Sequence, residues 1–267
     1  MLTHSRLSLL TALTLITLHT SQAYAQTAAN PAAIGADLAR DINTTIMQEM
    51  SANEKAALSE IKPFGNPIEI KYNENAKNPP VILTMVESKH TGGAVAAQVG
   101  VSILMSVLSG GVSMGASSFK KNQLAGSPIT NITDKQKLFN PTLNEFRQQF
   151  AGVIDEQVKT QFADKKFKGY FEVTPDVWKL VYDKTNNENA DESTYKLHYG
   201  VTVARGGGGF FSMQKAETCQ VQSEAKSLKT WKENDYAALA QARTPLIQDC
   251  LKQLSGKQEK MIGWLVD

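Results

Sequence analysis

The feature that most constrains this chain is a run of 29 residues, Thr91 to Phe119, that contains no charged side chain. Lys89 precedes the run and Lys120 follows it. Eleven of its residues are Val, Ile, Leu, Met or Phe, and sixteen are Gly, Ala or Ser. The run is too long for a core strand of about four to eight residues. It is long enough to cross a bilayer as a helix, which takes about 20 apolar residues.

Small residues recur at every fourth position of the run, and this spacing lets two helix backbones approach each other closely. Because Gly and Ser dilute the apolar residues, a lone span would gain little from the bilayer, and a packed partner would favour insertion. Three interpretations stay open: insertion into a membrane or assembly with other copies, a buried helix or hairpin, and a Gly/Ser-rich loop. We expect the first, with a contact surface made by Gly92, Ala96, Gly100, Ser106, Gly110, Gly111 and Gly115.

The first 25 residues have the organisation of a secretory signal peptide. Arg6 supplies a positive charge, an apolar stretch runs from Leu7 to Leu18, and Ala23-Tyr24-Ala25 places small residues at the cleavage positions. We therefore predict cleavage before Gln26 and export to the periplasm or the outer membrane. A retained N-terminal anchor is the alternative.

Cys219 and Cys250 are the two cysteines of the chain. An even pair in an exported protein predicts a disulfide, and the chain-entropy model gives it a contribution of roughly 3–4 kcal/mol. If the run crossed the inner membrane once, Lys120 and Lys121 would favour a cytoplasmic position for the chain that follows. Both cysteines would then stay reduced. A hairpin that returns to its starting side, or insertion into an outer membrane, removes this conflict.

The composition excludes several classes of function. Lys and Arg together number 28 and Asp and Glu 26, and no basic stripe is interleaved with aromatic residues, so we expect no nucleic-acid partner. The chain has no HExxH, P-loop or dinucleotide-binding motif. Two of its four histidines lie in the predicted signal peptide, which leaves little material for a metal site. We expect neither a cofactor nor a metal.

The chain before the run predicts one helix and two strands. Ile34 to Ile61 has apolar residues about every four positions, as in an amphipathic helix. Ile68 to Tyr72 alternates apolar and charged residues, and Pro80 to Val86 is a continuous apolar stretch, as in a strand covered on both faces.

After the run, the pattern predicts a sheet between two amphipathic helices. Asn140 and Pro141 mark the start of the first helix, which we expect to end at about residue 164. The second helix is expected at about 235–254, with a kink or break at Pro245. The last apolar stretch, 261–266, predicts an edge strand. Four strand candidates, spaced as in an antiparallel meander, are 168–173, 177–182, 195–203 and 218–223.

Together these elements predict an α+β protein with an antiparallel sheet packed by two amphipathic helices. An N-terminal helix and the Gly/Ala/Ser-rich apolar segment, helical or a hairpin, would be added to it. The expected parts are a signal peptide (1–25), a linker with the N-terminal helix (26–66), two strands with the uncharged run (67–134), and a C-terminal α+β domain that holds the disulfide (135–267).

The run also contains Gly111-Val112-Ser113-Met114-Gly115, which matches the G-x-S-x-G elbow of serine hydrolases. His198 is the one histidine after Ser113, so these two are the candidates for a nucleophile and its base. The setting argues against them, because Ser109-Gly110 interrupt the strand that would enter the turn and little room is left for the helix after it. In addition, His198 lies on the polar face of a regular strand pattern. The match is typical of a stretch so rich in Gly and Ser.

Four consecutive glycines precede Phe210 and Phe211. This stretch reads as a hairpin tip or as a hinge that exposes both rings to a membrane or a partner. The function most consistent with all these patterns is a non-enzymatic envelope protein with a structural or interaction role, in which 91–119 inserts into a membrane or mediates self-assembly. Its expected partners are a membrane, other envelope proteins and further copies of the chain. The alternatives are a soluble periplasmic binding or inhibitor-like module and a serine hydrolase.

Overall fold

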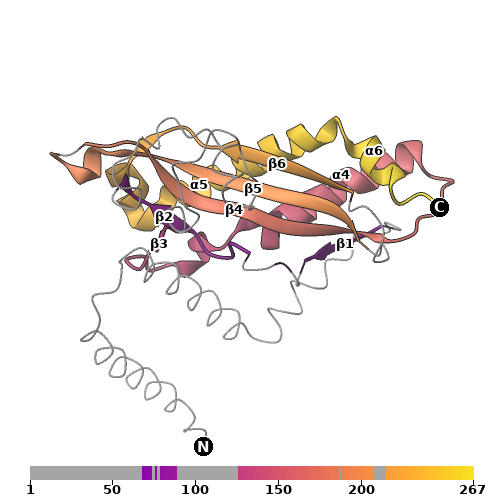
Figure 1. The fold of residues 1–267 in the computed structure, drawn as a ribbon, viewed down its shortest axis with the longest axis horizontal. Coiled ribbons are helices and arrows are strands. Elements are labelled where there is room, and N and C mark those ends of the chain that lie inside the picture. Colours follow the sequence, from indigo (N-terminus) through magenta and orange to yellow (C-terminus); the bar gives the residue numbers. More distant parts are fainter. Residues whose placement is uncertain (1–67, 74–75, 77–78, 89–125, 187, 207–214) are drawn as a thin grey trace, which may run out of the picture.

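The computed structural model describes residues 68–73, 76, 79–88, 126–186, 188–206 and 215–267. In these ranges a mixed sheet of seven strands and three α-helices form an α+β fold (Figure 1). The predicted signal peptide, the predicted N-terminal helix and the uncharged run lie outside the described residues.

The sheet is built around two long strands, β4 and β5, which pair antiparallel. β6 and β7 pair antiparallel with the other side of β5, and β3 pairs antiparallel with β2. β1 and β2 both run parallel to β4, so the sheet is mixed and not antiparallel as predicted. The strands are β1 (Glu69–Tyr72), β2 (Thr84–Val86), β3 (Ser127–Pro128), β4 (Tyr170–Lys184), β5 (Thr194–Gly206), β6 (Ala216–Gln222) and β7 (Lys226–Ser227).

The two strand candidates that flank Pro175 form one strand in the structure. β4 continues through Pro175, with a bulge between Pro175 and Val177. Proline lacks an amide hydrogen and is tolerated at bulges and where no neighbouring strand needs its donor. β1 ends opposite Val173 and β2 begins opposite Lys179, so Pro175 lies in the gap between these two neighbours.

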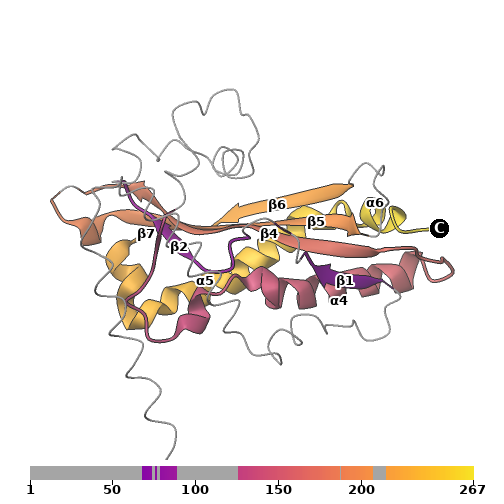
Figure 2. The ribbon, with the colours of Figure 1, turned by 60° about the horizontal axis from the view of Figure 1, so that its bottom comes forward.

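The helices cover one face of the sheet, as Figures 1 and 2 show. Phe150 of the first long helix packs edge-on against Phe171 of β4, with ring centroids 5.7 Å apart. Trp178 of β4 is fully buried and donates its indole N–H to the carbonyl of Leu138 at 2.8 Å. Burial of such large aromatic side chains supplies much of the stability of a core. The helices are α4 (Glu145–Gln161), α5 (Leu228–Ser255) and α6 (Gln258–Gly263).

The start of the first helical region agrees with the sequence pattern, with one refinement. The side chain of Asn140 accepts a hydrogen bond from the amide of Thr142 at 2.9 Å, which is the predicted cap. This cap begins a 3-10 turn, Pro141–Leu143, and α4 itself starts at Glu145.

The last long helix differs more from the prediction. α5 begins at Leu228, capped by Ser227, and continues through Pro245. Its departure from helical backbone lies at Glu233–Tyr236 and not at the proline. Within this break the Asp235 carboxylate accepts hydrogen bonds from the amides of Thr133 and Asp134. These backbone donors lower the pKa of Asp235 to about 2.

The apolar end of the chain forms the short helix α6 and a single bridge between Phe167 and Val266, so the predicted edge strand is wrong. The spacing of its buried residues explains the difference. Met261 and Ile262 of α6, and Leu265 just after it, have exposed fractions of zero, and two adjacent buried positions do not follow the alternation of an edge strand with one buried face.

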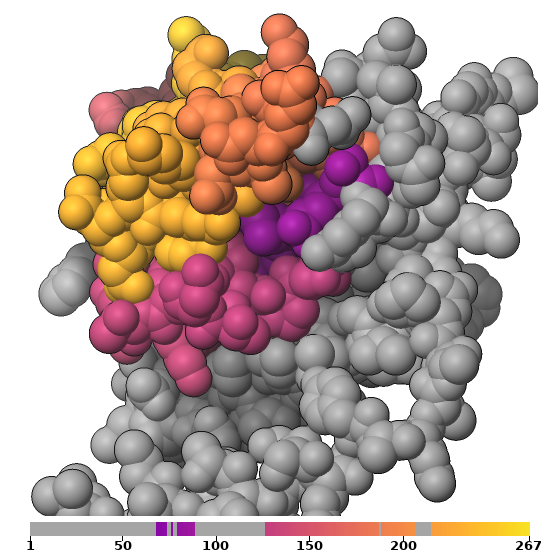
Figure 3. All heavy atoms as spheres, turned by 90° about the vertical axis from the view of Figure 1, so that its left-hand side faces the viewer, coloured from indigo at the N-terminus to yellow at the C-terminus, as the bar shows by residue number. Residues whose placement is uncertain are grey.

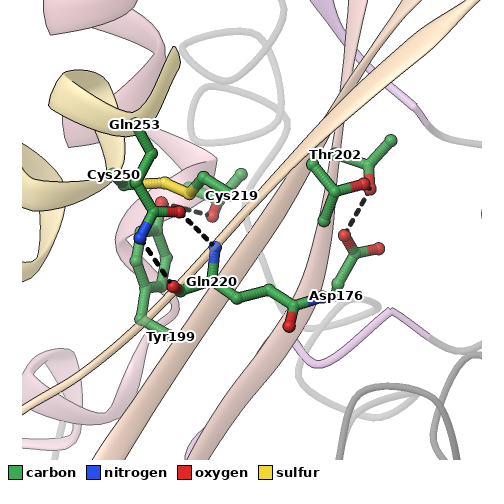
Figure 4. The surroundings of a disulfide bond; sticks show 9 residues. Asp176, Tyr199, Thr202, Cys219, Gln220, Cys250 and Gln253 are labelled. Carbon is green, nitrogen blue, oxygen red and sulfur yellow. Dashed lines mark hydrogen bonds between the residues drawn. A yellow bond between two sulfur atoms is a disulfide. The ribbon is translucent and has the colours of Figure 1, made fainter. Parts of the chain in front are cut away.

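The predicted disulfide between Cys219 of β6 and Cys250 of α5 is confirmed, with both residues fully buried and 5.4 Å between their Cα atoms (Figure 4). One turn further along α5, the side-chain amide of Gln253 binds the backbone of Gln220. It accepts from the Gln220 amide at 3.1 Å and donates to the Gln220 carbonyl at 3.0 Å. Together these contacts attach the end of α5 to β6.

Candidate functional site

Residues 89–125, which contain the uncharged run, begin and end at the same place in the described structure. The described residues stop at Ser88, just after β2, and resume at Gly126, just before β3. These two strands pair, with Met85 opposite Ser127. Residues 89–125 are therefore an insertion between two adjacent antiparallel strands. Figure 3 views this end of the molecule, where the purple atoms around β2 lie between the magenta and orange parts of the chain.

Gly126 holds the returning chain close to β2. Its φ is +75°, and a Cβ atom built on it would lie 2.9 Å from the carbonyl oxygen of Met85. Glycine adopts this backbone conformation without strain and leaves room for the close approach. Any other residue at this position would push the two ends of the insertion apart.

The sheet face opposite the helices has a buried centre beside β2. Along β5, Tyr199 points toward α4, where its ring meets that of Phe146, so its neighbour His198 lies on the opposite face. His198 pairs with Lys179 of β4, and Lys179 pairs with Thr84 of β2. We call this centre the buried patch; its members are Thr84, Val86, Val177, Lys179, Val181 and His198, all 9% exposed or less.

Burial sets the charge state of the two basic groups in this patch. It lowers the pKa of His198 to about 4, with a further lowering by Lys196 and an opposing effect of Asp183. It also lowers the pKa of Lys179 to about 7. The Lys179 ammonium donates to the Thr84 hydroxyl at 3.2 Å, whereas His198 Nδ1 has no hydrogen-bond partner among the described residues. The imidazole is therefore neutral at neutral pH.

The structure places only one of the two hydrolase candidates. Ser113 lies outside the described residues, and His198 lies in the middle of β5, on a face that the sequence pattern marked as polar but that is buried here. Asp183 pairs with Lys196 at 3.0 Å, and Asp176 accepts from Thr202, so neither carboxylate is shown bonded to His198. A catalytic base needs an orienting partner and a pKa near its working pH. The described surroundings of His198 give it neither.

The remaining predicted site residues also lie outside the described ranges. They are Phe210 and Phe211, together with the small residues of the run: Gly92, Ala96, Gly100, Ser106, Gly110, Gly111 and Gly115. Within the described ranges, none of the helices has the length and hydropathy of a membrane span. The same ranges contain no group of three or more His, Cys, Asp or Glu suited to a metal ion.

Sequence reasoning missed Lys179 as the neighbour of His198 and Thr84 as the neighbour of Lys179. A signal was present, because Lys179 interrupts the otherwise apolar stretch from Val177 to Tyr182. A lysine within an otherwise apolar strand indicates that an ionisable group lies on a buried face of the sheet. No protein-family model, curated protein or solved structure matches this chain.

Proposed function

We propose that the protein is a non-enzymatic, exported component of the cell envelope that uses residues 91–119 to enter a membrane or to assemble with other copies of itself. The observation that carries this proposal is the meeting of both ends of the insertion 89–125 at the β2–β3 pair. A folded body thereby presents an uncharged segment, rich in apolar and small residues, as one loop from one edge of its sheet.

The position of the two ends favours a hairpin over a single span. Because Ser88 and Gly126 lie at the same edge, an inserted segment would enter and leave from the same side. With a bend at Gly110-Gly111 and a rise of 1.5 Å per residue, helical arms 91–109 and 112–119 would be about 28 Å and about 12 Å long. The hydrocarbon core is about 30 Å thick. The second arm is too short to cross it, so we propose re-entrant insertion.

A hairpin also agrees with the disulfide. Cys219 and Cys250 are bonded, and disulfides persist mainly in oxidising compartments, which supports such a compartment for the body of the protein. A segment that returns to its starting side leaves the body in that compartment, whatever the effect of Lys120 and Lys121 on orientation. Small residues at every fourth position would let the arms, or the arms of several copies, pack closely.

The test is fractionation of the processed protein, with alkali extraction of the membrane fraction. The unaltered protein is expected to stay with the membrane, or to sediment as an oligomer. The double substitution Val101→Asp, Leu104→Asp is expected to release it as a soluble monomer, because each Asp opposes insertion by about 3 kcal/mol near the centre of a span. Gln241→Asp, an exposed position on α5, is the matched control and should change nothing.

Two outcomes would overturn the proposal. One is an unaltered protein that fractionates as a soluble monomer. The other is an unchanged distribution when residues 91–119 are deleted.

A further inference from the structure

We infer that α5 has two states: the form described above, which is broken at residues 234–236, and a minor form that is one continuous right-handed helix. In the minor form the first part of α5, residues 228–232, leaves the end of the sheet. This inference goes beyond the proposed function and does not depend on it, because it rests on α5 and the described residues that contact it.

Three consecutive residues of α5 have left-handed backbone, and we call them the left-handed turn. The φ angles of Asn234, Asp235 and Tyr236 are +50°, +56° and +59°. In this conformation the Cβ atom crowds the following carbonyl oxygen, so all three residues are strained. Asn and Asp tolerate it better than a bulky residue such as Tyr. A right-handed helix would relieve this strain.

The sequence around the left-handed turn is compatible with a continuous right-handed helix. Residues 233–244 contain neither glycine nor proline, and 237–240 are Ala-Ala-Leu-Ala, which are strong helix formers. In a continuous helix Asp235 would lie four positions from Trp231 and four from Leu239, in the middle of one apolar stripe. Asp235 is therefore the side chain that opposes the continuous form. The stripe consists of Leu228, Trp231, Leu239, Ala242 and Leu246.

The Asp235 carboxylate holds the left-handed turn against the chain that follows β3. It accepts from the amides of Thr133 and Asp134 at 2.6 and 3.0 Å, and it pairs with the Lys137 ammonium at 3.0 Å. The same ammonium donates to the Asp235 carbonyl at 2.8 Å. These donors stabilise the charged carboxylate, so acid of ordinary strength does not release it. Rotation of Asp235 into the apolar stripe would break these contacts.

The two parts of α5 are attached to different regions of the protein. The part after the left-handed turn is covalently bound to β6 through Cys219 and Cys250. The part before it is held by Trp231, which is fully buried and donates its indole N–H to the Tyr195 carbonyl at 3.0 Å. Straightening α5 therefore moves the first part and withdraws Trp231 from the core. The loss of this burial keeps the continuous helix a minor state.

Glycine substitutions test the left-handed turn itself. Asn234→Gly should raise the urea midpoint of unfolding, because glycine adopts a positive φ without strain. Ala240→Gly is the matched control: this residue is exposed in the right-handed part of the same helix, and its replacement should lower the midpoint. If both substitutions lower the midpoint alike, α5 is right-handed at position 234 and the inference is overturned.

The substitution Asp235→Leu tests the second state, because it removes the contacts of the carboxylate and completes the apolar stripe. Spin labels on Lys229→Cys and Lys252→Cys, both exposed, report the distance between the two parts by pulsed electron paramagnetic resonance. A continuous helix sets these positions about 35 Å apart, at about 1.5 Å per residue. The population at this distance should grow in Asp235→Leu. It should not grow in the control Asp249→Leu, an exposed position on the same helix. Distances that Asp235→Leu leaves unchanged would overturn the inference.

Hydrogen exchange of the Trp231 indole measures the same opening without labels, and Trp178 serves as the internal reference. Both indoles are fully buried and donate to a backbone carbonyl. Asp235→Leu should accelerate exchange at Trp231 about tenfold or more relative to Trp178, whereas Asn234→Gly should slow it. Asp235→Asn should give a smaller acceleration, and it replaces Asp235→Leu if that variant does not fold. An unchanged ratio of the two exchange rates would contradict the second state.

Discussion

The buried His198 makes the stability of this protein depend on pH in a way that one substitution removes. Its pKa is about 4 in the folded protein and 6.5 in an unfolded chain, and burial is the main cause of the difference. Between these two values the unfolded chain binds more protons than the folded one. The free energy of unfolding therefore falls as the pH drops from about 6.5 to about 4, and this contribution is constant at lower pH.

The size of the effect follows from the two pKa values. Between pH 7 and pH 5, proton binding by the unfolded histidine lowers the free energy of unfolding by about 2 kcal/mol. His198→Leu and His198→Gln lack the titrating group, so each should lose this part of the pH dependence. His198→Leu also removes the Nδ1 atom that has no partner among the described residues, and it should be at least as stable as the unaltered protein at pH 5.

Urea unfolding at pH 7 and pH 5, followed by tryptophan fluorescence, measures this difference. Trp178 and Trp231 are fully buried, so their emission reports the loss of the core. The difference between the unaltered protein and each variant cancels the other titrating groups, which all three share. If the free energies of all three proteins fall in parallel between the two pH values, the assignment of a depressed pKa to His198 is refuted.

Three further changes test the packing of the fold. Replacing both Cys219 and Cys250 by alanine should lower the free energy of unfolding by about 3–4 kcal/mol through the loss of loop constraint; a urea midpoint equal to that of the oxidised protein would contradict this. Phe150→Ala should lower it by about 3–5 kcal/mol, whereas Gln148→Ala, exposed on the same helix, should change it by less than about 0.5 kcal/mol. Gln253→Ala should lower it by about 1–2 kcal/mol in thermal or urea unfolding. Gln253→Glu should have an intermediate effect, because a carboxylate accepts from the Gln220 amide but cannot donate to its carbonyl.

Local sequence patterns predicted those elements whose apolar residues recur with the period of a strand or a helix, or whose ends carry a capping residue. The sequences of β1 and of the first ten residues of β5 alternate between apolar and other residues, and Asn140 caps its turn through its own side chain. The disulfide was predicted from an even pair of cysteines in a chain that is expected to be exported. Pro175 misled the prediction, because a proline normally ends a strand. Its tolerance depends on the gap between β1 and β2, which the residues around Pro175 do not reveal.

The candidate site was harder to predict because it depends on pairing between distant segments. β3 has two residues, Ser127–Pro128, and carries no strand pattern of its own. Without it, nothing in the sequence shows that the two ends of 89–125 meet. The buried patch likewise joins residues from β2, β4 and β5, and the single local sign of it was a lysine within an apolar stretch.

The amide of Gln253 has a consequence for how copies of this protein can associate. At Gln220 it occupies the donor and acceptor positions that the backbone of an added strand would use. Proteins protect the edges of their sheets in this way against uncontrolled growth from one molecule to the next. Strand addition at β6 would first have to displace a side chain of the same molecule. The proposed association of copies would therefore use the opposite edge of the sheet, where the two ends of 89–125 meet at β2 and β3.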